Sequence, residues 1–401
     1  MKFRRNQNLK VERSSYKNRN NFKSNPTKNR VFIVVFCLVI TIFIGFLGYQ
    51  LINKRVEPNK GKTPTTTDSL DKEIKDKASE SPKEPEQEPE PEQIPEVKDD
   101  PNITGYTSKN VFIYNNEGFE LFGGSEAMAK KYAAILNAIK AKLGTGVKVY
   151  NMVVPTHAEF GLPPKHKKLT NSQKENIDAI YSQYSENGVI PVDAYKALQM
   201  HSNQYIYFHT DHHWTSLGAS YAFNAFAKVA GEKPVDLQSL TKKTIPDFVG
   251  YLYTASKDNT LKNNPDHVDY YEIPGNLNCS LWQTGATDSI TVPLYAERAS
   301  GGNAYSVYLH GDSCLMTIKH TDDNKNGKKI MLVGESYKNA FGPFLALYYK
   351  EVHVVDLRHS KADLWEYVKQ NGIDEVIILN YTMAANTGQM HNHLKNRFGA
   401  Y

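Results

Sequence analysis

Cysteine is scarce in this sequence, with three residues among 401. Cys37 lies within a long apolar run, so only Cys279 and Cys314 could form a disulfide bond outside it. The sequence leaves open whether these two residues pair. A single pair does not make a disulfide-stapled scaffold, so that class of small secreted protein is excluded.

Acidic residues are nearly missing from residues 1–30, which hold ten Lys or Arg and only Glu12. Without this tail, the 48 basic and 43 acidic residues of the whole chain fall to 38 and 42. The remainder is slightly acidic, so the net charge of +5 does not indicate nucleic-acid binding. It indicates membrane topology and contact with anionic lipid, and we expect no nucleic-acid partner.

Charge is absent from residues 31–52, VFIVVFCLVITIFIGFLGYQLI. This run is long enough for a helix that crosses a bilayer. No small-residue cleavage site follows it, so we expect a retained signal anchor and not a removed signal peptide. The basic tail before it places the N-terminus in the cytoplasm and the rest of the chain outside the cell membrane. A buried core helix is the alternative, and its flanks disfavour it.

Large apolar residues are nearly absent from residues 53–100, a stretch with KEPEQEPEPEQIPE at its centre. Such a segment cannot bury enough apolar surface to offset its chain entropy. We therefore expect a disordered Pro/Glu-rich linker that acts as an extended stalk.

Residues 101–401 have a globular composition, large enough for one extracellular domain with a single core or with an added lobe. Strand and helix patterns alternate along it, which predicts an α/β fold: a mostly parallel sheet with helices on both faces. Residues from about 244 to 325 lack helical periodicity and predict a β-rich insertion of hairpins. The expected strands are 148–155, 189–195, 205–210, 328–334, 351–358 and 374–381, and the expected helices are 125–144, 171–188, 217–231, 337–349 and 361–372.

The sequence lacks an HExxH motif, yet FHTDHHWTS at 208–216 is rich in possible ligands and bases. If the segment is extended, Asp211 and His213 share one face and His212 points away. An Asp-x-His pair can supply a base and the carboxylate that orients it. Alternatively, His209, Asp211 and His213, with His157 from another strand end, could bind zinc. A structural polar turn is the third interpretation, and we favour the catalytic one.

Two serines lie in a Gly-acid-Ser context. Ser313, in HGDSC, falls between two expected short strands, so we interpret HGDS as a structural hairpin turn. Ser336, in VGESY, follows the buried strand IMLV and opens a helix. Its side chain is expected at the carboxyl edge of the sheet, where the helix N-terminus offers N–H groups to an oxyanion. A plain helix cap is the alternative for Ser336 alone.

These motifs together resemble the DHHW family of bacterial exported proteins, which is named for the four residues in TDHHWT. KKIMLVGESYKNAFGPFLALYYKEVHVVDLRH is similar to the C-terminal block of that family, in which a G-D-S-[FY] turn links a strand to a helix. SVYLHGDSCLMTI and VVPTHAEFGLPP resemble two further family segments. This chain departs from the pattern at Glu335, where the family usually has Asp.

The resemblance extends to the alginate O-acetyltransferases of the SGNH-hydrolase-like superfamily, and it implies roles for individual residues. Ser336 would be the nucleophile, His213 the base and Asp211 its orienter, with the Asp-x-His before the serine in the chain. Arg358 and Tyr381, at the ends of the last two strands, are weaker candidates for oxyanion or glycan contact. No cofactor and no metal is expected.

The expected function is a membrane-anchored serine O-acetyltransferase that modifies a cell-wall polysaccharide or exopolysaccharide. The resemblance also implies a partner, a multispanning membrane acyltransferase that exports the acetyl group. An acetyl esterase with the same triad is one alternative. A non-catalytic glycan-binding scaffold is another.

Overall fold

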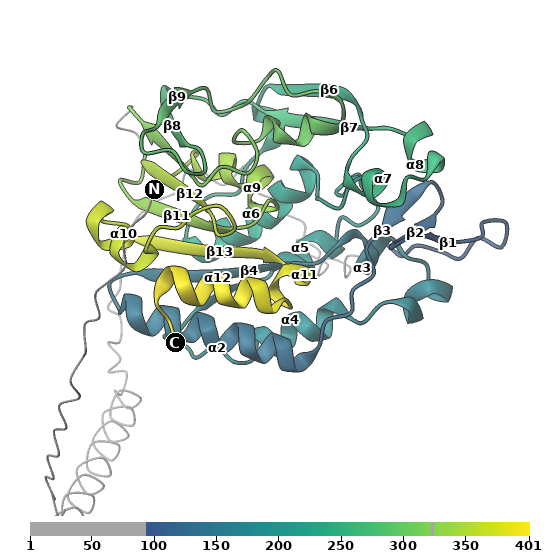
Figure 1. Cartoon of the computed structure of the whole chain (residues 1–401), viewed down its shortest axis with the longest axis horizontal. Coiled ribbons are helices and arrows are strands. Elements are labelled where there is room, and N and C mark those ends of the chain that lie inside the picture. Colours follow the sequence, from purple (N-terminus) through teal and green to yellow (C-terminus); the bar gives the residue numbers. More distant parts are fainter. Residues whose placement is uncertain (1–93, 322–324) are drawn as a thin grey trace, which may run out of the picture. The chain divides into compact units, whose positions relative to one another are not determined.

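The computed structural model describes residues 94–321 and 325–401. An eight-stranded sheet organises this part of the chain, with the strand order β5-β4-β13-β11-β12-β10-β8-β9 (Figure 1). Its strands are β4 (Lys148–Val154), β5 (Ile190–Val192), β8 (Leu277–Trp282), β9 (Ile290–Val292), β10 (Leu315–His320), β11 (Lys329–Gly334), β12 (Glu351–Asp356) and β13 (Glu375–Tyr381).

The sheet has a parallel half and an antiparallel half. Strands β5, β4, β13, β11 and β12 pair parallel with one another. Strands β10, β8 and β9 continue the sheet antiparallel. The predicted α/β fold is therefore confirmed. The sheet is mixed, because five of its strands are parallel and the other three are antiparallel.

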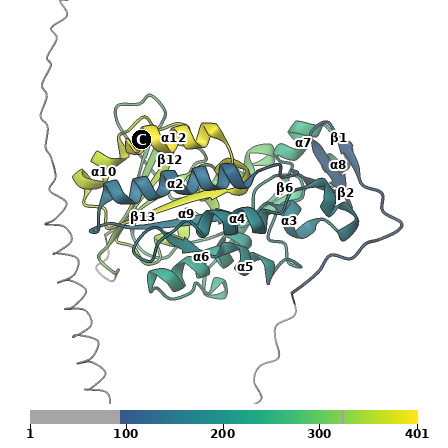
Figure 2. The same cartoon turned by 90° about the horizontal axis from the view of Figure 1, so that it is seen from below.

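Helices cover both faces of the parallel half, because its strands are apolar on both sides. In β4, Val149 and Val153 pack into one hydrophobic layer, whereas Tyr150 and Met152 pack into the other. Figure 2 shows the two helical layers above and below the sheet. One layer holds α2 (Glu126–Leu143), α4 (Gln173–Tyr181), α10 (Leu364–Asn371) and α12 (Gly388–Phe398); the other holds α5 (Ala194–Gln199), α6 (Ser216–Ala230) and α9 (Lys338–Leu345).

Side-chain caps define where the long helices begin. The Ser125 hydroxyl accepts the N–H of Met128 at the start of α2, and the Thr215 hydroxyl accepts the N–H of Gly218 at the start of α6. These bonds satisfy backbone donors that the first turn leaves unpaired. The predicted cap of α2 at Ser125 is confirmed, whereas α6 begins at Ser216, one residue before its predicted start at 217.

The predicted β-rich insertion differs from the structure. Strands β6 (Lys242–Phe248) and β7 (Asp266–Tyr271) form a two-stranded ribbon, as expected of a hairpin insertion. Between them lie two short helices, α7 (Tyr251–Ser256) and α8 (Asn259–Asn263). Strands β8, β9 and β10 form no separate lobe, because β10 pairs with the otherwise open edge of β12.

The prediction of a strand just before HGDS is also wrong. Residues Gly301–Val307 form the 3₁₀ helix η3, in which local bonds replace strand pairing; for example, the Ser306 hydroxyl donates to the carbonyl of Asn303. Cys279 and Cys314, on β8 and just before β10, are both free thiols. Burial raises the pKa of Cys279 to about 11.

The remaining elements are a small sheet and several short helices. A three-stranded antiparallel sheet opens the described part, and short helices connect the main elements. They are β1 (Tyr106–Ser108), β2 (Val111–Tyr114), β3 (Glu117–Phe119), α3 (His157–Gly161), η1 (Pro164–Leu169), η2 (Leu237–Ser239) and α11 (Thr382–Ala385).

The predicted cytoplasmic tail 1–30 and membrane anchor 31–52 lie outside the described residues, as does nearly all of the predicted linker 53–100. Within residues 94–321 and 325–401, no helix combines the length and the apolar character needed to cross a bilayer.

Candidate active site

Ser336 lies in the turn between β11 and α9, at the carboxyl edge of the parallel strands. The last residue of β11 is Gly334, and a larger residue does not fit there because a Cβ would lie 2.1 Å from the carbonyl oxygen of Leu379 on β13. The Glu335 carboxylate accepts the N–H groups of Tyr337 at 2.8 Å and Tyr381 at 2.9 Å. Glu335 therefore fastens the serine turn to the end of β13, in the position where the family pattern has Asp.

The segment before the DHHW residues does not form the predicted strand over 205–210. It makes one isolated bridge, between Tyr207 and Trp214, and the chain turns back on itself between them. The buried Asp266 carboxylate accepts the N–H groups of His209 and Thr210 and the Thr210 hydroxyl. These local and long-range bonds satisfy the backbone in place of a sheet partner.

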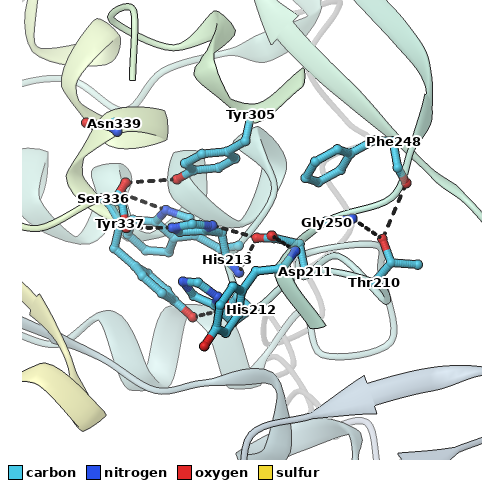
Figure 3. A network of polar contacts seen from close by, with 12 residues as sticks. Thr210, Asp211, His212, His213, Phe248, Gly250, Tyr305, Ser336, Tyr337 and Asn339 are labelled. Carbon is cyan, nitrogen blue, oxygen red and sulfur yellow. Dashed lines mark hydrogen bonds and ion pairs between the residues drawn. The ribbon is translucent and has the colours of Figure 1, made fainter. Parts of the chain in front are cut away.

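Asp211, His213 and Ser336 form one chain of hydrogen bonds (Figure 3). The Asp211 Oδ1 lies 2.5 Å from the His213 Nδ1, and the His213 Nε2 lies 2.7 Å from the Ser336 Oγ. A carboxylate on Nδ1 leaves Nε2 free to exchange a proton with the serine hydroxyl. The structure thus brings together the three residues predicted for catalysis.

The β-rich insertion holds the Asp211 carboxylate from the other side. Its Oδ2 accepts the N–H of Tyr251, at 2.7 Å, where α7 begins. Gly250 permits this approach, since a Cβ there would lie 2.3 Å from the Asp211 Cβ. Burial alone raises the pKa of Asp211, but His213, His212 and the bound N–H groups outweigh burial and hold it well below its usual range. Asp211 is therefore ionised.

Tyr305 covers the face of the His213 ring. The two rings stack with centroids 3.9 Å apart and planes within 11°, and the Tyr305 hydroxyl donates to the Ser336 carbonyl at 3.1 Å. Tyr305 lies in the segment that the sequence predicted as a strand. Its contact with His213 crosses more than ninety residues of sequence, and no local motif marks it.

The extended geometry predicted that His212 points away from His213, and this prediction is wrong. The two rings lie 4.1 Å apart, and the His212 ring also lies near Tyr251 and Tyr381. The reason is that the Asp211 Oδ1 also accepts the backbone N–H of His213, so this segment is a turn. Burial lowers the pKa of His212, and the neighbouring His213 lowers it further.

A cavity of about 810 Å³ opens over these residues. Ser336, His213 and the weaker predicted site residues Arg358 and Tyr381 all line it. The ring of Tyr381 stacks on that of Tyr337 at 4.7 Å. Glu120, directly after β3, also lines the cavity and has no counterpart among the predicted site residues.

Arg358 is held by two carboxylates. Its Nε and Nη2 donate to the two oxygens of Asp356 at 3.0 and 2.8 Å, and Nη2 also lies 2.9 Å from an oxygen of Asp312. Asp356 in turn pairs with the buried ammonium of Lys338 at 2.9 Å. His310, Gly311 and Asp312 of the HGDS motif thus line this cavity, whereas Ser313 is not part of its wall.

The Asn339 side chain is oriented toward the same cavity. The Lys338 Nζ donates to the Asn339 Oδ1 at 3.1 Å, and the Asn339 Nδ2 donates to Asp312 at 3.1 Å. The N–H groups of Tyr337, Lys338 and Asn339 all have protein partners. The first turn of α9 therefore offers fewer free N–H groups than the sequence argument expected.

The structure separates the residues considered for zinc. His157 and His209 both approach Glu117, at 3.3 and 3.8 Å, away from Asp211. Asp211, His212 and His213 lie close enough together to share an ion. However, the direct bonds of Asp211 to His213, and of His213 to Ser336, already use one Asp211 oxygen and both ring nitrogens of His213.

Comparisons with known proteins agree with this architecture. Residues 60–355 match the family described as DHHW protein. The crystal structure of a DHHW family protein from Eubacterium siraeum is 31% identical, with a TM-score of 0.68, over 73% of this chain and 97% of that one. The chain therefore belongs to the DHHW family.

More distant structures also match. Bacillus cereus PatB1, solved with a sulfonyl adduct, is 17% identical with a TM-score of 0.57, over 72% of this chain and 98% of that one, so it shares the fold. The O-acetyltransferase domain of Pseudomonas putida AlgJ is 15% identical with a TM-score of 0.40, over 73% and 98%. No curated protein matches the sequence.

Proposed function

We propose that this member of the DHHW family is a serine O-acetyltransferase that modifies a cell-wall polysaccharide or exopolysaccharide through an acetyl-Ser336 intermediate. The observation that carries the proposal is the continuous hydrogen-bond chain from Asp211 through His213 to Ser336 at the wall of an open cavity. The O-acetyltransferase resemblance of the sequence motifs supports acetyl as the transferred group.

In the first half-reaction, the His213 Nε2 accepts the Ser336 proton while Oγ attacks the acetyl carbonyl carbon. The ionised Asp211 fixes the His213 tautomer and stabilises the imidazolium that forms. The tetrahedral intermediate then collapses, the bond to the donor oxygen breaks, and His213 returns its proton to that oxygen. Ser336 is left as an acetyl ester.

In the second half-reaction, a sugar hydroxyl enters and His213 accepts its proton. The sugar oxygen attacks the acetyl carbon, the bond to the Ser336 Oγ breaks, and His213 reprotonates the serine. Water in place of the sugar would complete an esterase reaction with the same residues. Both half-reactions therefore use His213 first as base and then as acid.

The oxyanion of each tetrahedral intermediate needs a donor. We assign this role to the Asn339 amide, which lies one helical turn after Ser336 and lines the cavity. Lys338 holds the amide oxygen, so the Nδ2 is presented to Asp312 and the cavity. Arg358 and Tyr381 remain proposed contacts for the glycan, through their polar groups.

The topology of the whole chain is part of the proposal. A signal anchor at 31–52 and a stalk at 53–100 would tether the catalytic domain outside the cell membrane, within reach of glycan. A multispanning membrane acyltransferase would supply the acetyl group from the cytoplasm. Detection of the full-length chain by protease accessibility on intact cells tests the orientation.

Hydrolysis of p-nitrophenyl acetate by the purified chain tests the chemistry. We expect p-nitrophenol release that Ser336→Ala abolishes and that Ser313→Ala, its matched control, leaves intact. Equal activity in Ser336→Ala would remove Ser336 as nucleophile. Product analysis with a glycan acceptor then separates transfer from hydrolysis, and glycan binding without any turnover would support a scaffold instead.

A further inference from the structure

We infer that the cavity is built for a sugar acceptor that offers hydroxyl or amino donors and carries no negative charge, and that Glu120 with His212 forms its acceptor subsite. The inference rests on the proposed function and extends it from glycans in general to one class. The inferred class includes neutral sugars and amino sugars, and it excludes uronates.

The charges on the cavity wall favour this class. Four carboxyl groups line the cavity, those of Glu120, Asp211, Asp312 and Glu335. Asp211 is ionised, whereas burial raises the pKa of Glu120 and of Glu335. The single guanidinium on the wall, that of Arg358, already binds Asp356 and Asp312 and is not available to neutralise an incoming anion. A uronate carboxylate would therefore enter a field of its own sign without a free counter-charge.

The histidines on the wall do not reverse this field. Burial lowers the pKa of His212 and of His393, so both favour the neutral form. His213 is committed to Asp211 and Ser336, and the His310 Nε2 binds the carbonyl of Pro293 at 2.7 Å.

Glu120 and His212 each also have a polar side-chain atom without a hydrogen-bond partner. The Glu120 Oε2 and the His212 Nδ1 are buried, and neither has a partner within the described residues. Burial raises the pKa of Glu120, the attraction of His212 lowers it, and Asp211 raises it. A buried polar atom without a partner is unfavourable, so a ligand donor that reaches this pair gains a bond that the free protein lacks.

The position of the pair suits an acceptor. The His212 ring lies 4.1 Å from that of His213, the residue that must take the acceptor proton. In its ionised form Glu120 only accepts hydrogen bonds, so that form binds a hydroxyl or an ammonium group and does not pair with a carboxylate. Glu120 and His212 thus interact with the acceptor close to its reacting hydroxyl, where a negative charge on the acceptor would be unfavourable.

The test uses the full-length chain with p-nitrophenyl acetate as donor and three acceptors of equal length. These are glucosamine, glucose and galacturonate oligomers. We expect acetyl transfer to the first two to exceed transfer to galacturonate by about tenfold or more. Glu120→Gln should narrow this preference at least threefold, whereas Glu120→Asp, which keeps the charge, should preserve the order.

Glu117→Gln is the matched control, because Glu117 lies on the same hairpin but contacts His157 and is not part of the cavity wall. Its acceptor preference should equal that of the unmutated chain. Equal or better transfer to galacturonate, or an unchanged preference in Glu120→Gln, would overturn the inference while leaving the proposed function intact.

Binding gives a readout that does not depend on turnover. Titration calorimetry of Ser336→Ala with the same three oligomers should show weakest binding for galacturonate. A reversed order would overturn the inference even if no acetyl transfer is ever observed. Absence of both p-nitrophenol release and acetyl-Ser336, with the expected binding order, would instead refute the proposed function alone.

Discussion

The indole N–H of Trp214 donates to the backbone carbonyl of Tyr337 at 2.9 Å, although 123 positions separate the two residues. Trp214 is fully buried, and the Tyr337 hydroxyl returns a bond to the carbonyl of His212. The loop that carries the base is thereby fixed to the turn that carries the nucleophile. The 2.7 Å contact between the His213 Nε2 and the Ser336 Oγ therefore depends on this buried connection.

Replacing Trp214 should loosen this connection. Trp214→Phe leaves the buried carbonyl of Tyr337 unpaired, so we expect a loss of about 1–3 kcal/mol in the unfolding free energy and a lower kcat. Trp365→Phe is the matched control, since its N–H bond to Lys142 is exposed. Urea unfolding of residues 94–401 measures both. Equal losses in the two variants would contradict the bracing role of Trp214.

Tyr305 should act as a positioning residue through its stacked ring. An aromatic face favours a cation by about 0.5–2 kcal/mol, so loss of the ring should lower kcat by roughly 2- to 30-fold. We therefore expect Tyr305→Leu to lower kcat with little change in KM. Tyr305→Phe keeps the ring and should recover most of the rate, whereas a loss as large as that of Tyr305→Leu would assign the effect to the hydroxyl.

The Asn339 amide should matter in the transition state more than in substrate binding. Removal of one oxyanion donor typically lowers kcat by about 10²- to 10³-fold. We expect Asn339→Ala to show a loss of that size with a KM near that of the unmutated chain. Thermal unfolding is the control for folding, because Lys338 and Asp312 also bond to Asn339. A full kcat in the folded variant would exclude the role.

His157 should make the fold sensitive to acid. Burial lowers its pKa to about 3, below the value of about 6.5 in an unfolded chain. The unfolded state therefore binds the proton first, and stability falls as the pH drops from about 6.5 toward 3, by up to ~1.4 kcal/mol per pH unit.

Denaturant titrations over this pH range check the effect. His157→Gln should flatten the dependence of unfolding free energy on pH, whereas the same change at the half-exposed His267 should not. A slope that is unaffected by His157→Gln would show that other buried groups account for the acid sensitivity.

Local sequence patterns predicted the parts of this site that depend on neighbouring residues. The apolar run before Gly334, followed by an acidic residue and Ser336, correctly placed the serine in a strand-to-helix turn. Gly231 correctly marked the end of the helix after the DHHW residues. Each of these features is set within a few residues of the chain.

Contacts between distant segments were not predictable in the same way. Residues 205–210 have an apolar pattern typical of a strand, but the Asp266 carboxylate captures their N–H groups from more than fifty positions away. Tyr251 reaches Asp211 from a region that lacked any helical pattern. The rotation of His212 toward His213 follows from the turn that these contacts impose. The membrane anchor and stalk stay predictions.

The central claim is that Ser336 carries the acyl group, and mass spectrometry of a trapped adduct tests it most directly. We expect p-nitrophenyl acetate, or a sulfonyl fluoride, to modify a peptide at Ser336 in the unmutated chain and in Ser313→Ala, and His213→Ala to suppress the modification. A stable adduct on Ser313 or on another residue, with Ser336 unmodified, would contradict the account.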